Sequence, residues 1–313
     1  MEEKSPISEE APLGGAALRG SSWSTARQRL SVPNTRLLLC ASGVSFMIML
    51  DSNVVAVSLP VIARDLGANF DDIDLVVSAY VLPFVAFLMA AGALADRFGR
   101  RRLLLTGLFI FTLASVLCGL APNATVLNAA RGLQGLGSAM QFSATLAVLG
   151  HTFRGPERAR AFAFWATLIG IAVAIGPLVG GFITSAFSWR WGFLVNVPVG
   201  ACLIALGLAS IDESSDPGAK SLDFFGMLLF GSALFSLVWG LLDANAEGWS
   251  GTATLMKLAA AATLLLIFVV VELVQERPMV DLTLFRNPTF LGSSFAMLGF
   301  ASTAQVMMIY LPL

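Results

Sequence analysis

Two side chains that can bind a proton or an ion lie inside apolar stretches of this sequence. Asp51 follows an uncharged run over residues 37–50, and Arg131 ends another over residues 103–130. A carboxylate within a membrane span costs about 2.5–3.5 kcal/mol to insert, so Asp51 is predicted to serve a function. The alternatives are an Asp51 at the outer end of its helix and an Arg131 whose head group extends to the interface.

The spacing of these two charges from the nearest polar boundaries predicts that they lie at a similar depth. Asp51 comes 15 residues after Arg36, which is about 22 Å of helix. Arg131 comes eight residues after Asn123, which is about 12 Å in the opposite direction. In a hydrocarbon core of about 30 Å, the two side chains reach each other if their helices are neighbours.

The elements that hold these residues are predicted to be membrane helices. Of the 313 residues, 57% are hydrophobic and only 12% are charged, whereas soluble domains carry about 25% charged residues. Residues 1–35 are polar, have no periodic apolar face and are predicted to be a disordered cytoplasmic tail. Apolar runs of bilayer-crossing length predict nine spans, over residues 37–62, 75–95, 103–121, 124–150, 160–186, 192–211, 223–243, 255–275 and 289–313.

The distribution of Lys and Arg predicts that the N-terminus is cytoplasmic. With that orientation, 15 of the 19 basic residues fall in inner segments, and only Arg64, Arg190 and Lys257 fall in outer ones. Cytoplasmic loops of membrane proteins carry such an excess of basic residues. We therefore expect a multi-pass protein of the plasma (inner) membrane. The ninth span has no polar flank, so we also expect the chain to be part of a longer protein.

The residue patterns of common enzymes are absent from the sequence. It contains no G-x-x-x-x-G-K-S/T phosphate loop, no Ser/His/Asp or metal-ligand cluster, and a single histidine, His151. Its three cysteines are far apart and indicate neither a disulfide framework nor a metal site. The net charge of −1 gives no reason to expect a nucleic-acid partner. We expect no catalytic activity, no metal and no cofactor.

A charged connector between two apolar runs has the sequence GALADRFGRRR, residues 92–102. Its arginines alone fit a role in topology, which leaves Asp96 and the two glycines unexplained. The segment resembles the G-x-L-A-D-R-x-G-R-K/R-K/R pattern that follows helix 2 of major facilitator superfamily transporters. Residues 50–60, 128–137 and 170–181 are similar to motifs of the fourteen-helix drug:proton antiporter branch. The first of these departs from its pattern at Asn53, Ala56 and Ser58, and the last at Ala172.

This resemblance implies roles for the residues named above. Asp51 and Arg131 would couple protons or substrate, and Asp96 would meet the N-terminal end of a helix from the other half. The connector would be a conformational latch that includes Gly92, Asp96, Arg97, Gly99, Arg100 and Arg101. Gly92 and Gly99 would allow close helix approach and a tight turn.

Two further segments receive roles from the same resemblance. One helix would seal the cavity between the halves through Ala172, Gly176, Pro177, Gly180 and Gly181. The four-residue spacing of its small residues makes one face smooth, and ordinary small-residue packing is the alternative. The outer connector over residues 189–198 is assigned to interfacial anchoring, because Trp189 and Trp191 are typical of an aromatic belt.

The resemblance also implies an all-α membrane protein with the major facilitator fold. Residues 36–211 would form the N-terminal six-helix half, residues 212–288 two linker helices, and residues 289–313 the first helix of a truncated second half. The function would be proton-coupled export of small hydrophobic or cationic compounds, such as antibiotics, by alternating access. Its partners would be the substrate, protons, the lipid bilayer and the missing second half. The alternatives are transport of another small solute, and a truncated membrane product that transports nothing.

Overall fold

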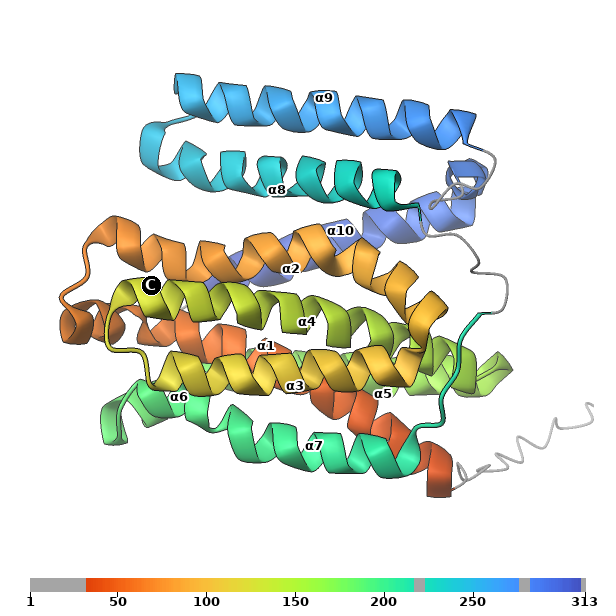
Figure 1. The fold of residues 1–313 in the computed structure, drawn as a ribbon, viewed down its shortest axis with the longest axis horizontal. Helices are drawn as coiled ribbons and strands as arrows, with labels where there is room; N and C mark the ends of the chain where they lie inside the picture. Colours follow the sequence, from red (N-terminus) through yellow and green to blue (C-terminus); the bar gives the residue numbers. More distant parts are fainter. Residues whose placement is uncertain (1–31, 217–222, 276–281, 311–313) are drawn as a thin grey trace, which may run out of the picture. The chain divides into compact units, whose positions relative to one another are not determined.

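The computed structural model of the protein describes residues 32–216, 223–275 and 282–310. This part of the chain is helical, with no strand among its residues (Figure 1). The predicted tail lies outside the described residues except for its last four positions, which belong to the first helix, α1 (Val32–Leu66). Pro33 fits the first turn of α1, because a helix needs no amide donor there.

From α1 to α5 the helices follow one another in an up-and-down order with short connections (Figure 1). Each predicted span coincides with one long helix, except the sixth, which is divided between α6 and α7. The elements after α1 are α2 (Phe70–Phe98), α3 (Arg100–Gly119), α4 (Ala124–Thr152), α5 (Gly155–Ala186), α6 (Arg190–Leu194), α7 (Asn196–Ser210), α8 (Phe224–Glu247), α9 (Thr252–Val274), the short 3-10 helix η1 (Leu282–Arg286) and α10 (Pro288–Tyr310).

Seven helical segments of the described chain are long and apolar enough to cross a membrane, and they confirm seven of the nine predicted spans. They are α1, α2, α3, α5, α6 with α7, α8 and α9. The helix α4 is not among them, because polar residues such as Asn128, Arg131 and Gln141 lower its hydropathy. These side chains are buried between helices, so they are not presented to lipid. The ninth predicted span, residues 289–313, runs past the described residues.

The first seven helices pack so that α4 lies between α2 and α3, and α1 contacts α5, α7 and α4. Gly137 allows the close approach of α4 to α3, since a Cβ there would lie 2.7 Å from the backbone nitrogen of Phe111. The helices α8 and α9 form a hairpin whose first helix packs along α2 (Figure 1). Asp51, near the middle of α1, and Arg131, in the N-terminal part of α4, are therefore enclosed by other helices.

Candidate functional site

The central feature of the helix bundle is an ion pair between α1 and α4. Arg131 Nη1 donates a hydrogen bond to Asp51 Oδ2 over 2.9 Å. The Asp51 side chain is 0% exposed and the Arg131 side chain 2% exposed. The predicted contact between the two charges is therefore confirmed. Both alternatives are wrong in this structure, because neither side chain reaches an interface.

Two amide side chains complete the hydrogen bonding of the Asp51 carboxylate. Asn196 Nδ2 and Gln134 Nε2 both donate to Asp51 Oδ1, over 2.6 Å and 3.1 Å. Hydrogen bonds to an ionised acceptor are roughly twice as strong as neutral ones, so the carboxylate binds α1 firmly to α4 and α7. All three donors and the carboxylate are buried.

The guanidinium of Arg131 is fixed by contacts with α2 and α4. Its Nε donates to the carbonyl oxygen of Val76 over 3.2 Å, and its Nη1 also donates to Gln134 Oε1 over 2.8 Å. The guanidinium carbon lies 4.1 Å from the centre of the Tyr80 ring, a cation–π distance. Arg131 therefore links Asp51 to α2 as well as to α4.

Three residues of this site were missed as functional candidates from the sequence. Gln134 lies one helical turn after Arg131, in the motif over residues 128–137. This spacing places it on the same face of the helix as Arg131 and could have identified it. Tyr80 gave no local signal. Asn196 was assigned with its neighbours to interfacial anchoring, and that interpretation is also wrong for Trp189, which is 2% exposed and donates to Asp65 Oδ2 over 2.8 Å.

The predicted latch is helical, and Gly99 alone separates α2 from α3. Asp96 and Arg97 lie in the last turn of α2, and Arg100 begins α3. Gly99, with φ of 112°, reverses the chain in this one residue, a conformation that side chains disfavour. The carboxylate of Asp96 accepts a hydrogen bond from Arg100 Nη2 over 2.8 Å.

The segment after α7 packs across this turn, which no sequence pattern predicted. The backbone amides of Arg101 and Arg102 both donate to the Glu213 carboxylate over 3.2 Å. The first amides of a helix have no partner within the helix and favour an anion. A Cβ at Gly99 would lie 2.6 Å from Glu213 Cδ, so a side chain there would displace the Glu213 carboxylate from these amides.

Other latch residues are free of close neighbours in the described part of the chain. A Cβ added at Gly92 meets nothing within 4 Å, so no helix of the described chain approaches closely there. Arg97 is exposed and lies over the ring of Phe98, with 5.4 Å from its guanidinium carbon to the ring centre. Arg97 is therefore open at the C-terminal end of α2, and Gly92 is without a tight contact on a different side of the same helix.

The glycine-rich segment of α5 uses its smooth face to pack on α1. Ala172, Gly176 and Gly180 are buried, and a Cβ at Gly180 would lie 3.0 Å from Val54 Cα. The smooth face is confirmed, but it packs within the described bundle and does not face a second half. Pro177 is exposed, and a Cβ at Gly181 meets nothing within 4 Å, so these two residues lie away from α1.

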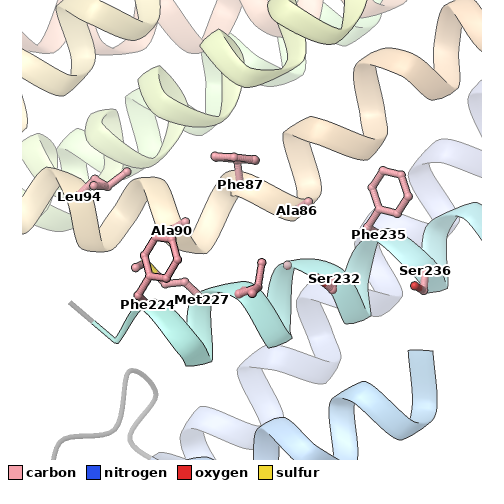
Figure 2. Close-up of a pocket in the computed structure, with 11 residues that line it drawn as sticks. Ala86, Phe87, Ala90, Leu94, Phe224, Met227, Ser232, Phe235 and Ser236 are labelled. Atoms are coloured by element: carbon pink, nitrogen blue, oxygen red, sulfur yellow. The ribbon is translucent and has the colours of Figure 1, made fainter. Parts of the chain in front are cut away.

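An apolar groove of about 370 Å³ lies between α2 and α8 (Figure 2). Figure 2 shows aromatic and aliphatic side chains from both helices around it. The groove contains neither Asp51 nor Arg131, so it is separate from the ion pair. Its lining is formed by Ala86, Phe87, Ala90, Leu94, Phe224, Met227, Leu228, Gly231, Ser232, Phe235 and Ser236. Over the described ranges, no group of three His, Cys, Asp or Glu residues is placed to hold a metal.

Comparison with known proteins finds relatives with names related to drug resistance. Multidrug resistance protein Stp of Mycobacterium tuberculosis (strain CDC 1551 / Oshkosh) is 40% identical over 81% of this chain and 48% of its own length. The tetracenomycin C resistance and export protein of Streptomyces glaucescens is 35% identical over 87% of this chain and 48% of its own length. The methylenomycin A resistance protein of Bacillus subtilis (strain 168) is 33% identical over 85% and 57%. The chain thus spans about half the length of the curated relatives it matches.

Solved structures and a family model agree on the fold. A peptide transporter POT in complex with sulfate aligns with a TM-score of 0.55 at 16% identity, over 76% of this chain and 52% of the other. The POT family transporter PepTSo aligns with a TM-score of 0.54 at 14% identity, over the same shares. The model of the Major Facilitator Superfamily matches residues 41–313. The chain therefore belongs to the Major Facilitator Superfamily and is a multi-pass membrane protein.

Proposed function

We propose that this chain provides the N-terminal half of a proton-coupled exporter of small hydrophobic or cationic compounds. The exporter lies in the plasma membrane with its N-terminus in the cytoplasm, in line with the distribution of basic residues. The names of its relatives, which refer to multidrug resistance and to resistance against two antibiotics, support this cargo class. The observation that carries the proposal is the buried Asp51–Arg131 pair.

The proposed mechanism uses Asp51 as the group that binds the transported proton. In its charged form the carboxylate accepts hydrogen bonds from Arg131, Gln134 and Asn196. A bound proton removes the negative charge that holds these donors, and Arg131 then loses its counter-charge in a buried position. Alternating access moves helices around a site near the middle of the membrane. Proton binding at Asp51 therefore changes the contacts of α1 with α4 and α7.

The opposing interpretation is that the pair only holds helices together, because buried ion pairs also occur in purely structural roles. The test is Asp51→Asn in a transporter that contains both halves, with efflux of a cationic dye followed under an imposed proton gradient. We expect proton-driven efflux to be lost at normal membrane levels, and Asp51→Glu to retain part of it. The matched control is Asp65→Asn, at the outer end of the same helix, where the carboxylate pairs with Arg190.

A specific result separates the two interpretations. If Asp51→Asn exports the dye with an unchanged dependence on pH, Asp51 does not bind the transported proton and the pair is structural. If efflux fails for Asp51→Asn and Asp65→Asn alike, the loss is due to impaired packing of α1. A transporter for another small solute is the second candidate, and it is favoured if proton flux depends on Asp51 but no cationic or hydrophobic dye is moved.

We propose that the connector and α5 also act on the second half, through the faces that the described chain leaves open. Gly92 and Arg97 lie on the open inner end of α2, and Pro177 and Gly181 lie on the side of α5 away from α1. The smooth face of α5 is already occupied by α1. The seal between halves is therefore assigned to the neighbouring face of α5, which contains Pro177 and Gly181.

A further inference from the structure

The helix α4 carries a row of buried polar side chains that extends well beyond the ion pair. The residues occur at alternating intervals of three and four, which places them on one face of the helix. Each is at most 2% exposed. The row spans 14 residues, about 21 Å of helix, and consists of Arg131, Gln134, Ser138, Gln141 and Thr145.

In the N-terminal part of this row, the side chains have hydrogen-bond partners within the protein. Arg131 and Gln134 bind Asp51, Gln134 Nε2 also donates to Ser115 Oγ over 3.0 Å, and the Tyr80 hydroxyl donates to Ser138 Oγ over 3.0 Å. These contacts come from α1, α2 and α3. The ion pair therefore belongs to a polar face of α4 that continues towards the C-terminal end of the helix.

In the C-terminal part of the row, polar atoms have no hydrogen-bond partner within the protein. Both side-chain polar atoms of Gln141 and the hydroxyl of Thr145 make no hydrogen bond, and the same is true of Ser42 Oγ on α1. All three side chains are 0% exposed. Ser42 lies nine residues before Asp51, about 14 Å along α1, and Gln141 ten residues after Arg131, about 15 Å along α4. The two helices run in opposite directions, so Ser42 and Gln141 lie at a similar depth, but a spacing of nine residues places Ser42 on the side of α1 opposite to Asp51. Only Gln141 and Thr145 therefore belong to the row on α4.

Buried polar atoms in proteins nearly always have a partner, and internal water supplies it where protein does not. A dry row would leave three polar atoms desolvated without compensation, which costs folding free energy at each of them. Apolar residues of similar size would be free of this cost. We propose that water molecules bind along Gln141 and Thr145 and form a chain that carries protons between Asp51 and the cytoplasmic side.

The ends of the chain are defined by the structure. Its upper end is the Asp51 network, whose neighbouring ionisable groups are Arg131, Tyr80 and Cys118. Its lower end is Thr145, which lies seven residues, about 10 Å, before the end of α4 at Thr152. The exposed His151 lies in that last turn. The water site stands on the unpartnered atoms alone, whereas the proton route also rests on the proposed role of Asp51.

The water site is tested by NMR on the full chain in lipid nanodiscs, with nitrogen-15 in the glutamine side chains. We expect magnetisation transfer from water to the Gln141 amide, which is assigned by its loss in Gln141→Leu. Gln275 is exposed and serves as the positive control, and Gln134, whose amide is fully partnered, as the negative one. Loss of the Gln141 transfer in Thr145→Val would support a shared water chain. Transfer at Gln275 with none at Gln141 in the unmodified chain would overturn the proposal.

The proton route is tested by infrared spectroscopy on the full chain in vesicles, after acidification of the side at which α4 ends. The protonated carboxyl band of Asp51 is assigned by its absence in Asp51→Asn. We expect Gln141→Leu combined with Thr145→Val to abolish the fast appearance of this band, while Thr167→Val, at an exposed hydroxyl on α5, leaves it unchanged. An unchanged rate in the double variant overturns the route alone. If no band forms in the unmodified chain at any pH, the proton-binding role of Asp51 fails as well.

Discussion

Replacing Gly176 by Ala is expected to destabilise the protein, whereas the same change at Gly181 is expected to stabilise it. Both glycines lie inside α5, where Ala in place of Gly gains about 0.5–1 kcal/mol from the unfolded state. At Gly181 an added Cβ meets nothing within 4 Å, so this gain applies undiminished. At Gly176 the Cβ would overlap the Cβ of Asn53 in α1, so α5 or α1 must move.

The difference between the two variants isolates the packing of α5 on α1. Overpacking of a close contact costs about 1–3 kcal/mol, and the helical gain is common to both variants and cancels. We therefore expect Gly176→Ala to unfold about 1–3 kcal/mol more easily than Gly181→Ala. Gly180→Ala is expected to follow Gly176→Ala, because its Cβ would lie 3.0 Å from the Val54 Cα, a backbone atom that cannot rotate away.

The measurement is reversible unfolding of the full chain in mixed micelles by increasing amounts of dodecyl sulfate, followed by circular dichroism. Each variant adds one methyl group, and the two positions are five residues apart, so the unfolded states of the two variants are equivalent. If Gly176→Ala and Gly181→Ala have the same free energy of unfolding, the smooth face of α5 does not pack on α1. That result would return the face of Ala172, Gly176 and Gly180 to the role of a seal between halves.

Three other predictions concern the connector and the chain as a whole. Glu213→Ala is expected to lower the free energy of unfolding by about 0.5–2 kcal/mol, as loss of a helix cap does, and Glu213→Gln by less; an unchanged dodecyl sulfate midpoint for Glu213→Ala would refute the cap. Asp96→Asn in a transporter with both halves is expected to abolish efflux at normal membrane levels, and normal efflux would refute the latch. The chain reconstituted alone in proteoliposomes is expected to show no substrate-dependent proton flux, and saturable flux would refute the need for a second half.

The helices and the ion pair could be predicted because both depend on regular helical geometry. A rise of about 1.5 Å per residue places Asp51 and Arg131 at one depth whatever the side-chain details are. The same regularity makes long apolar runs reliable signs of membrane helices. Hydropathy is weaker for α4, because its face towards other helices is polar and only its position between α2 and α3 keeps that face from lipid.

The partners of the predicted residues could not be found in the same way, because they are distant in sequence. Asn196 donates to Asp51 across 145 residues, and Glu213 accepts from Arg101 across 112 residues. Neither residue belongs to a local pattern that specifies its role. Their contacts depend on how α7 packs on α1 and α3, and on the path of the chain after α7, which local propensities do not determine.

The helix α1 is held by two kinds of contact that respond differently to the charge of Asp51. Its hydrogen bonds at Asp51 with α4 and α7 depend on the ionised carboxylate. Its contacts with α5 consist of small residues and neutral hydrogen bonds, such as the one between Ser58 and Thr184 over 2.8 Å, which are independent of that charge. Neutralising Asp51 therefore weakens one side of α1 only. If Asp51 binds the transported proton as proposed, this asymmetry favours movement of α1 together with α5 relative to α4 and α7.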